Sequence, residues 1–326
     1  MARAIDWSTV FTGAATPFRT DGGVDLPQFD RVISHLSNGA LGGIVVNAML
    51  SEGGQLSLAE RVSCVAEAVR RDKRPAIIAT VYGSSTRDAV EEARLVAQAG
   101  ADGLLIYPHP AFGGGTADTD LIVEYYSAIH DVSGLPLIVF RTPESLAPEL
   151  GVEALLALAE TSGVVAVKDS VADADFYTGP AAAFLTPSSP LKIMADNDVR
   201  LLPLLRRGAH GGMSMVAAIF PQAVADLLRV RNHAAAGELE RAILPLARAL
   251  AADPVRDFRA RIKYLLSYAG VTTSACVRRP LRELCAARHD VLADAYCTTK
   301  TNLAGFYARF PAVTASLAEG SAATWQ

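Results

Sequence analysis

Residues 75–108 read PAIIATVYGSSTRDAVEEARLVAQAGADGLLIYP, and this stretch decides the fold. Two short apolar runs rich in β-branched residues, at 75–82 and 102–108, flank an amphipathic segment that begins at Ser85 and stops at Gly100. Ser is a preferred helix N-cap and Gly a preferred helix stop, so the segment predicts a helix between two strands. Both runs are continuously apolar, which is typical of strands buried on both faces of a parallel sheet.

The same unit recurs through the first two-thirds of the chain. Helical patterns alternate with strand-like runs, and one helix begins with Ser57 and Glu60 in the spacing of a capping box. The runs lie at 11–18, 42–49, 75–82, 102–108, 135–141, 163–170, 191–197 and 211–218. Eight parallel βαβ units predict an α/β fold, the closed (β/α)₈ TIM barrel. The alternative is a doubly wound open sheet, which is disfavoured because no Gly-x-Gly-x-x-Gly turn follows the first run.

The strand pattern ends at residue 218, and only helical patterns follow. We therefore expect a barrel over 8–218, a C-terminal helical extension over 219–300 and a tail over 301–326. The extension is expected to pack on the barrel rather than to form a separate domain.

Composition excludes several classes of protein. The 30 basic and 34 acidic residues give a net charge of −4, so the chain has no basic excess for a nucleic-acid partner. No apolar run approaches the ~20 residues of a membrane helix, and the N-terminal residues do not form a secretory signal pattern. The four cysteines form no close pair. A cytoplasmic location, free thiols and no membrane association are therefore expected.

Only five of the basic residues are lysines, and their positions separate them. Active sites of (β/α)₈ barrels lie at the C-terminal ends of the strands, where Lys168 alone is found, directly after the apolar run 164–167. Apolar surroundings disfavour the charged form of an amine, and the uncharged amine is a nucleophile that forms a Schiff base with a carbonyl group. The alternative is a structural ion pair with Asp169 or Asp196.

Four segments together resemble one known family: ATPF at 15–18, GVVAVKDS at 163–170, RRGAHGGMSM at 206–215 and VRRPL at 277–281. They are similar to segments of the dihydrodipicolinate synthase and N-acetylneuraminate lyase family, and the resemblance covers roughly residues 8–290. It implies a (β/α)₈ Schiff-base lyase or aldolase with C-terminal helices, commonly a tetramer built from dimers. It also implies that Lys168 forms the imine.

Three parts of the family's pattern are changed in this chain. The Gly-Thr-Thr-Gly-Glu that holds the carboxylate of a 2-oxo acid is NAMLSEGG at 47–54, which keeps Glu52 and only Ser51 as a hydroxyl. The proton-relaying tyrosine of the fifth strand is Phe140. The Thr-Pro-Tyr-Tyr of the fourth strand is Tyr-Pro-His-Pro at 107–110, so the tyrosine contributed across a dimer interface is missing. A pyruvate-specific dihydrodipicolinate synthase is therefore not expected.

Other residues could take over the missing roles. His109 follows the fourth strand, and imidazole exchanges protons near neutral pH; Tyr107 is the weaker candidate. Arg141 could clamp a carboxylate through two parallel hydrogen bonds. Each assignment has a structural alternative: His109 as a loop residue between two prolines, and Arg141 in an ion pair with Asp169 or Glu52.

We therefore expect a Schiff-base-forming lyase, aldolase or dehydratase that acts on a 2-oxo acid or a related small carbonyl compound through Lys168. No metal and no organic cofactor are expected, and the chain is expected to form a homo-oligomer, a dimer or tetramer. The alternative is a barrel that has lost this catalysis and serves as a binding or regulatory protein, or a specialised enzyme with no imine. The expected catalytic residues are Lys168, His109 and Tyr107, and the expected substrate-binding residues are Arg141, Ser51, Glu52, Thr16 and Ser214.

Overall fold

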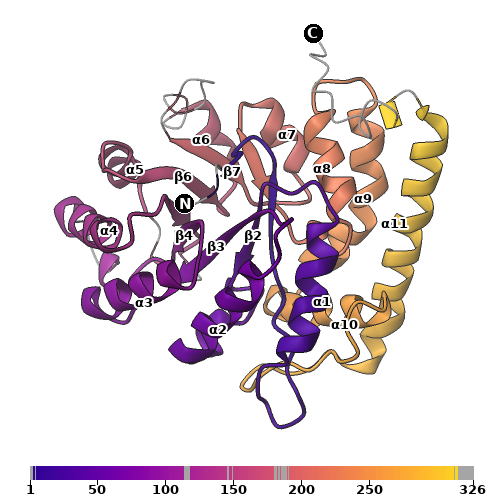
Figure 1. Ribbon diagram of the computed structural model, residues 1–326. Coiled ribbons are helices and arrows are strands. Elements are labelled where there is room, and N and C mark those ends of the chain that lie inside the picture. Colours follow the sequence, from indigo (N-terminus) through magenta and orange to yellow (C-terminus); the bar gives the residue numbers. More distant parts are fainter. Residues whose placement is uncertain are drawn as a thin grey trace.

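Eight parallel strands close into one barrel (Figure 1). The computed structural model describes residues 3–314, apart from residue 4 and from 114–117, 145–146, 149, 180–181, 183, 185–188, 190 and 312. The strands are β1 (Val10–Gly13), β2 (Gly43–Val46), β3 (Ala76–Val81), β4 (Gly103–Ile106), β5 (Leu137–Arg141), β6 (Val164–Asp169), β7 (Lys192–Ala195) and β8 (Gly211–Met213). Each overlaps one of the eight predicted runs, and β1 pairs with β8. The closed (β/α)₈ barrel is confirmed, and the open sheet is excluded.

Helices alternate with the strands, as the repeats predicted. They are α1 (Leu26–Ser37), α2 (Leu58–Val69), α3 (Thr86–Gln98), α4 (Thr119–Ser133), α5 (Val152–Ala159), α6 (Ala174–Thr178), α7 (Leu201–Arg206) and α8 (Pro221–Arg229). The capping box of α2 is formed: Ser57 Oγ accepts the Glu60 backbone N–H, and the Glu60 carboxylate accepts the Ser57 N–H. Short 3₁₀ turns also occur, at η1 (Gly53–Gln55), η2 (Pro110–Phe112), η4 (Val216–Ala218), η5 (Val255–Asp257) and η6 (Ala286–Arg288).

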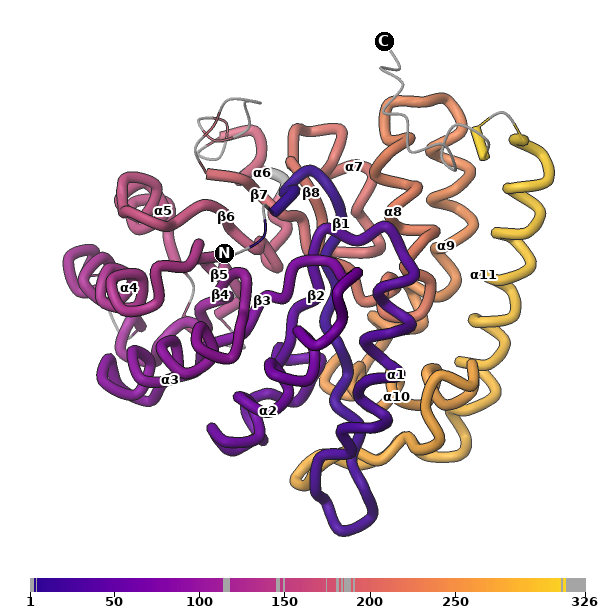
Figure 2. The backbone as a smooth tube through the Cα atoms, in the orientation of Figure 1, coloured from indigo at the N-terminus to yellow at the C-terminus, as the bar shows by residue number. Residues whose placement is uncertain are grey.

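The C-terminal extension packs beside the barrel. It comprises α9 (Ala236–Ala251), α10 (Phe258–Tyr268) and α11 (His289–Arg309), and the backbone trace shows α11 running alongside α9 (Figure 2). Because α11 continues to Arg309, the boundary expected at residue 300 falls inside a helix. The part of the expected tail after residue 314 lies outside the described residues.

Apolar side chains from all eight strands fill the barrel interior. Strand side chains alternate between two faces, so Ala166 points into the barrel while Val167 packs against the helices. The inward-pointing residues are Phe11, Val45, Ala76, Ile78, Leu105, Ile138, Phe140, Ala166, Met194 and Met213. Lys168 follows Ala166 by two positions, so its side chain points inward at the C-terminal end of β6.

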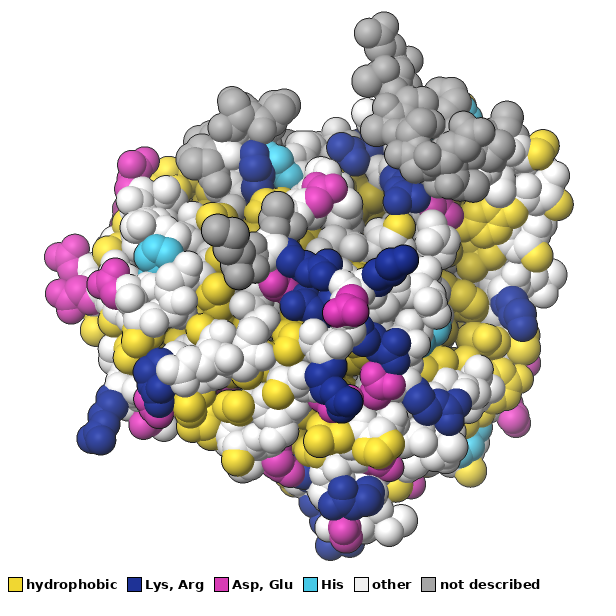
Figure 3. Space-filling view, in the orientation of Figure 1, with side chains coloured by type: hydrophobic (Ala, Val, Ile, Leu, Met, Phe, Trp, Pro, Cys, Tyr) yellow, Lys and Arg dark blue, Asp and Glu magenta, His cyan; other side chains and the backbone are white. Residues whose placement is uncertain are grey.

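The described surface carries both signs of charge. On the face that Figure 3 shows, Lys and Arg side chains lie interspersed with Asp and Glu. Within the described residues, no helix is both long enough and apolar enough to cross a membrane.

Candidate active site

Lys168 lies between a carboxylate and an aromatic ring at the mouth of the barrel. Its Nζ is 2.7 Å from Asp196 Oδ2 and donates to Ser170 Oγ at 3.2 Å. The same atom lies 3.6 Å from the centre of the Phe140 ring, which is its register partner on β5. The side chain is 16% exposed, so the amine is enclosed but reachable. The predicted position at a strand end is confirmed, and of the two candidate ion-pair partners the structure selects Asp196.

Ser170 and Asp196 give the amine an acid–base partner. The Ser170 hydroxyl accepts a hydrogen bond from Lys168 and donates one to Asp196 Oδ2. A base within hydrogen-bond distance of an ammonium group can take its proton and later return it. Neither residue was predicted to have this role from the sequence, although both directly follow strands, β6 and β7.

Two tyrosines extend an aromatic row from Phe140. Tyr107 meets the Phe140 ring edge-on at 5.7 Å between centroids, and Tyr82 stacks on Tyr107 at 5.0 Å. Burial raises the pKa of both phenols, and the nearby Arg259 guanidinium opposes the rise. Both hydroxyls therefore stay protonated at neutral pH. Tyr107 lies beside the Phe140 ring, which the Lys168 amine contacts, and its role as a proton donor stays a prediction.

His109 is held by backbone groups. Its Nδ1 accepts the Ala111 N–H at 3.1 Å, so the proton of the neutral ring is on Nε2, which lies 3.1 Å from the Ser84 carbonyl oxygen. The ring caps the η2 turn, which is the structural alternative for this residue. The proton-transfer role of His109 stays a prediction, but both ring nitrogens are already engaged.

Arg141 also adopts its structural alternative. It pairs in register with Asp169, and its Nη1 donates to Asp169 Oδ1 at 2.8 Å. The guanidinium lies 4.1 Å from the centre of the Phe176 ring of α6. Because strand side chains alternate, Arg141 lies on the helix-facing side of β5, opposite to Phe140. This geometry gives no support to the predicted carboxylate clamp.

Ser51 and Glu52, predicted to bind substrate, hold the loop after β2 in place. Ser51 Oγ donates to the Ala14 carbonyl oxygen at 2.5 Å and so ties this loop to the one after β1. The fully buried Glu52 carboxylate pairs with Lys263 through Oε1 and accepts the Arg278 backbone N–H through Oε2 at 2.8 Å. Both side chains are committed to protein contacts.

Thr16 and Ser214 differ in their environments. Ser214 Oγ donates to Asp198 and accepts the Ala217 N–H at 3.0 Å, so it stabilises the turn after β8. Burial raises the pKa of Asp198 to about 6. Thr16 is fully buried, and its hydroxyl has no hydrogen-bond partner among the described residues. Ser51, Glu52 and Ser214 are thus held by protein contacts. Of the four predicted binding hydroxyls and carboxylates, only the Thr16 hydroxyl has no partner among the described residues.

Two further threonine hydroxyls were missed by sequence reasoning. Thr80 follows the inward-pointing Ile78 by two residues, and Thr142 follows Phe140 by two. Both are buried, and neither hydroxyl has a hydrogen-bond partner in the part of the chain that the structure describes. Buried hydroxyls are normally hydrogen-bonded, so these are candidate ligand contacts.

The loop after β2 also presents backbone N–H groups. The Ala48 carbonyl accepts the Ser51 and Gly53 N–H groups at 3.0 Å, and the Met49 carbonyl accepts the Glu52 N–H at 3.2 Å. Among the described residues, no hydrogen bond involves the N–H of Ala48, Met49 or Leu50. Successive unpaired N–H groups in a turn form an anion-binding concavity.

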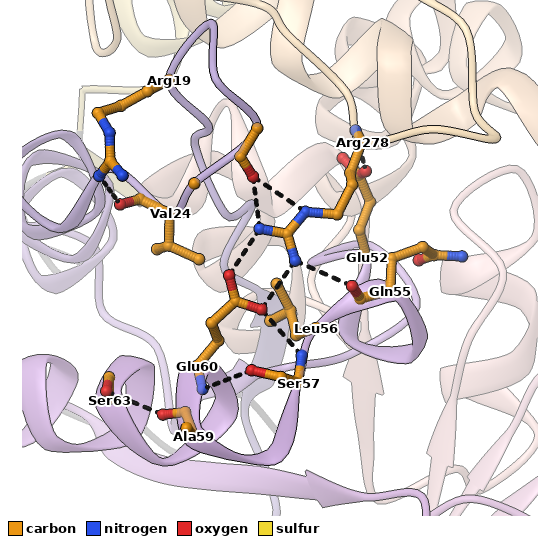
Figure 4. Close-up of polar contacts among 12 residues, drawn as sticks. Arg19, Val24, Glu52, Gln55, Leu56, Ser57, Ala59, Glu60, Ser63 and Arg278 are labelled. Carbon is orange, nitrogen blue, oxygen red and sulfur yellow. Dashed lines mark hydrogen bonds and ion pairs between the residues drawn. The ribbon is translucent and has the colours of Figure 1, made fainter.

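The C-terminal extension reaches this loop through an ionic cluster of Glu52, Glu60, Lys263 and Arg278. Figure 4 shows Arg278 beside Glu52 and Glu60. The Arg278 guanidinium donates to both oxygens of Glu60, at 2.7 and 2.8 Å, and to the Gln55 carbonyl at 2.9 Å. Lys263 Nζ, which pairs with Glu52, also donates to the Cys276 carbonyl at 2.8 Å. Burial lowers the pKa of Lys263 to about 8.

The Glu60–Arg278 pair makes stability depend on acid pH. Hydrogen bonding to Arg278 lowers the pKa of Glu60 from 4.5 to about 2. A lowered carboxyl pKa stabilises the fold above pH 4.5, and this contribution is lost as the pH falls from 4.5 to 2. Glu60→Gln is expected to reduce the loss of unfolding free energy between pH 4.5 and 2. Urea titrations at a series of pH values measure this loss.

The exposed Glu153 of α5, which has no ion pair among the described residues, provides the control for this prediction. Glu153→Gln should lose as much unfolding free energy below pH 4.5 as the wild type does. If Glu60→Gln and wild type lose stability equally steeply below pH 4.5, the assignment of this effect to Glu60 is wrong.

A large cavity lies elsewhere on the molecule. It has a volume of about 930 Å³ and is lined by residues of α1, α8 and α11 and of the segments before α8 and after α10, among them His35, Phe220, Asp226, Tyr296 and Tyr307. None of the predicted site residues lines it. Its position on the outside of the barrel separates it from Lys168.

The fold and this site define a (β/α)₈ barrel of the Schiff-base lyase class, with its lysine at the inner C-terminal end of β6. A sequence profile of the Dihydrodipicolinate synthetase family matches residues 6–296, and the chain belongs to this family. Within the described residues, no cluster of three or more His, Cys, Asp and Glu side chains could hold a metal ion.

Named relatives are similar at a moderate level of identity. The 4-hydroxy-tetrahydrodipicolinate synthase 2 of Streptomyces coelicolor is 30% identical over 241 residues, 72% of this chain and 75% of that protein. The 4-hydroxy-tetrahydrodipicolinate synthase of Methanothrix thermoacetophila is 28% identical over 248 residues, 74% of this chain and 81% of that protein. The solved structure of the synthase from Methylacidiphilum fumariolicum SolV has a TM-score of 0.80 at 24% identity, and covers 91% of this chain and 97% of its own. The chain is therefore a divergent member of the family.

Proposed function

We propose that this protein is a lyase, aldolase or dehydratase that forms a Schiff base between Lys168 and a 2-oxo acid or a related small carbonyl compound. The observation that supports this proposal is the position of Lys168 Nζ at the barrel mouth, 2.7 Å from the Asp196 carboxylate. The relatives are named as synthases, but this chain has Phe140 in place of the tyrosine of the family pattern, and its loop after β2 lacks the threonine pair. We therefore propose a reaction other than that of a dihydrodipicolinate synthase.

The proposed reaction begins with proton transfer. Asp196 takes a proton from the Lys168 ammonium, and the free amine adds to the substrate carbonyl carbon to give a carbinolamine. Return of the proton to the carbinolamine hydroxyl releases water and leaves the iminium. The iminium withdraws electrons from the adjacent carbon, so that a carbon–carbon bond or a carbon–oxygen bond at the next position can break.

Other groups at the mouth supply binding and proton donation in this proposal. The unpaired N–H groups of Ala48, Met49 and Leu50 would hold the carboxylate next to the carbonyl. The Tyr107 hydroxyl is the proposed proton donor in place of the tyrosine that Phe140 replaces. We also propose a homo-oligomer, because proteins of this family are usually oligomeric.

A barrel that has lost this catalysis remains the second candidate. Phe140, the engaged nitrogens of His109 and the Arg141–Asp169 pair favour it, because each removes a group that could assist the reaction. Such a protein would bind a small molecule at the same mouth without forming an imine.

Borohydride trapping tests the proposal. The protein is incubated with a panel of 2-oxo acids and aldehydes, reduced with borohydride, and digested for mass spectrometry. We expect one or more compounds to leave a reduced adduct on the peptide that contains Lys168, and no adduct when borohydride is left out. Absence of an adduct with every compound would favour the binding protein instead.

A further inference from the structure

Arg259, at the start of α10, differs from four other cations near the barrel mouth. Each of these four has a carboxylate partner: Lys168 has Asp196, Arg141 has Asp169, Lys263 has Glu52, and Arg278 has Glu60. Arg259 has no carboxylate within ion-pair distance among the described residues. It is half-buried, and desolvation lowers its pKa.

The Arg259 guanidinium is fixed beside the loop after β2. Its Nε donates to the Met49 carbonyl oxygen at 2.6 Å, and the group lies 4.5 Å from the centre of the neighbouring Phe258 ring. Met49 itself packs against the apolar cluster inside the barrel, as does Tyr107. The guanidinium therefore stands at the barrel mouth although its helix belongs to the C-terminal extension.

The aromatic row separates Arg259 from the amine. Tyr82, Glu52 and Tyr107 act electrostatically on the guanidinium, whereas Lys168 Nζ lies on Phe140 at the other end of the row. Ring centroids are 5.0 Å apart between Tyr82 and Tyr107 and 5.7 Å apart between Tyr107 and Phe140. An anionic group bound by Arg259 would therefore lie several bonds away from a carbonyl carbon at Lys168.

We infer that Arg259 binds a distal carboxylate of the substrate, so that the site selects dicarboxylic substrates that carry an anionic group at the end remote from the reacting carbonyl. This inference rests on the proposed function for the identity of the reacting end. Two terminal N–H groups of a guanidinium match the two oxygens of a carboxylate, and such charge-assisted hydrogen bonds are the strong ones. The unpaired N–H groups of Ala48, Met49 and Leu50 would hold the other carboxylate.

Binding of adipate and hexanoate by isothermal titration calorimetry tests the inference. Both have the same chain length, only adipate has a second carboxylate, and neither can form an imine. We expect the wild type to bind adipate about tenfold more tightly than hexanoate, since a hydrogen bond to a charged group contributes on that order. Arg259→Gln should remove this preference and leave hexanoate binding unchanged.

Two control variants make the result specific. Arg259→Lys keeps the positive charge and should keep a preference for adipate. Arg256→Gln changes an arginine of the same extension whose side chain is 82% exposed, and should bind both acids like the wild type. Thermal denaturation of each variant shows that the protein is folded.

The inference is overturned if the wild type shows no preference for adipate, whether or not either acid binds, or if folded Arg259→Gln keeps the wild-type preference. Failure of the Schiff-base proposal is distinguishable from this result. In that case borohydride leaves no adduct on Lys168, while adipate is still preferred and the preference still depends on Arg259.

Discussion

Replacement of Lys168 by arginine or methionine is expected to abolish the borohydride-trapped adduct and to lower turnover by about three orders of magnitude or more. The reason is that the amine would supply both the nucleophile and the electron sink of the proposed reaction. Arginine keeps a positive charge beside Asp196 but does not form an imine under these conditions. Mass spectrometry of the reduced protein and single-turnover kinetics measure the two effects.

Lys300 provides the matched control for this prediction. It is an exposed lysine on α11, far along the chain from the barrel strands, so Lys300→Met should keep both adduct and turnover. Circular dichroism establishes that the Lys168 variants retain the fold. An adduct of unchanged yield on folded Lys168→Arg would show that another amine reacts.

Breaking the Lys263–Glu52 pair is expected to destabilise the protein by about 3–5 kcal/mol, because removal of one partner leaves an uncompensated buried charge. The two side chains are 3% and 0% exposed. Lys263→Met leaves the Glu52 carboxylate without its cation, and Glu52→Gln leaves the ammonium without its anion. The shift of the urea midpoint, followed by circular dichroism, measures the loss.

A double variant and a surface ion pair serve as comparisons for this loss of unfolding free energy. Lys263→Met combined with Glu52→Gln removes both charges and should cost less than the sum of the single changes. Arg70 pairs with Glu67 and its side chain is 72% exposed. Arg70→Met should lower the free energy of unfolding by no more than about 1 kcal/mol. If Lys263→Met is as stable as Arg70→Met, the buried Lys263–Glu52 pair does not stabilise the fold by about 3–5 kcal/mol.

The barrel was predictable because its signals are local. Each strand is visible in the sequence as a short apolar run. Helix-capping side chains such as Ser57 and Glu60 form hydrogen bonds with backbone groups only a few residues away. The position of Lys168 followed from the same reading, because the end of a strand is visible in the sequence. Its partner Asp196 was one of two carboxylates that sequence alone could not separate.

The side of β5 on which Arg141 lies follows from the alternation of side chains along a strand. Phe140 and Lys168 are register partners on the inner face, so the next residues, Arg141 and Asp169, must point to the helices. Alternation together with this register accounts for their ion pair, which was the structural alternative for Arg141. The orientation of His109 carried no such signal, because it depends on the Ser84 carbonyl of a different loop.

The contribution of the C-terminal extension could not be predicted. Arg259 and Lys263 lie in a segment that reads as an ordinary charged helix, DPVRDFRARIKYLLSYAG. Their partners Met49 and Glu52 are about two hundred residues earlier in the chain, and local patterns do not specify contacts over such separations.

The contacts of Glu52 also have a consequence for biosynthesis. Arg278, whose backbone N–H contacts Glu52, follows it by 226 residues, so a ribosome makes all eight strands before this group and the Lys263 ammonium have emerged. A nascent chain that stops after α8 would contain the whole barrel sequence but expose an unpaired Glu52 and an unsupported loop beside the lysine. Completion of the mouth is thus delayed until the C-terminal extension has been translated.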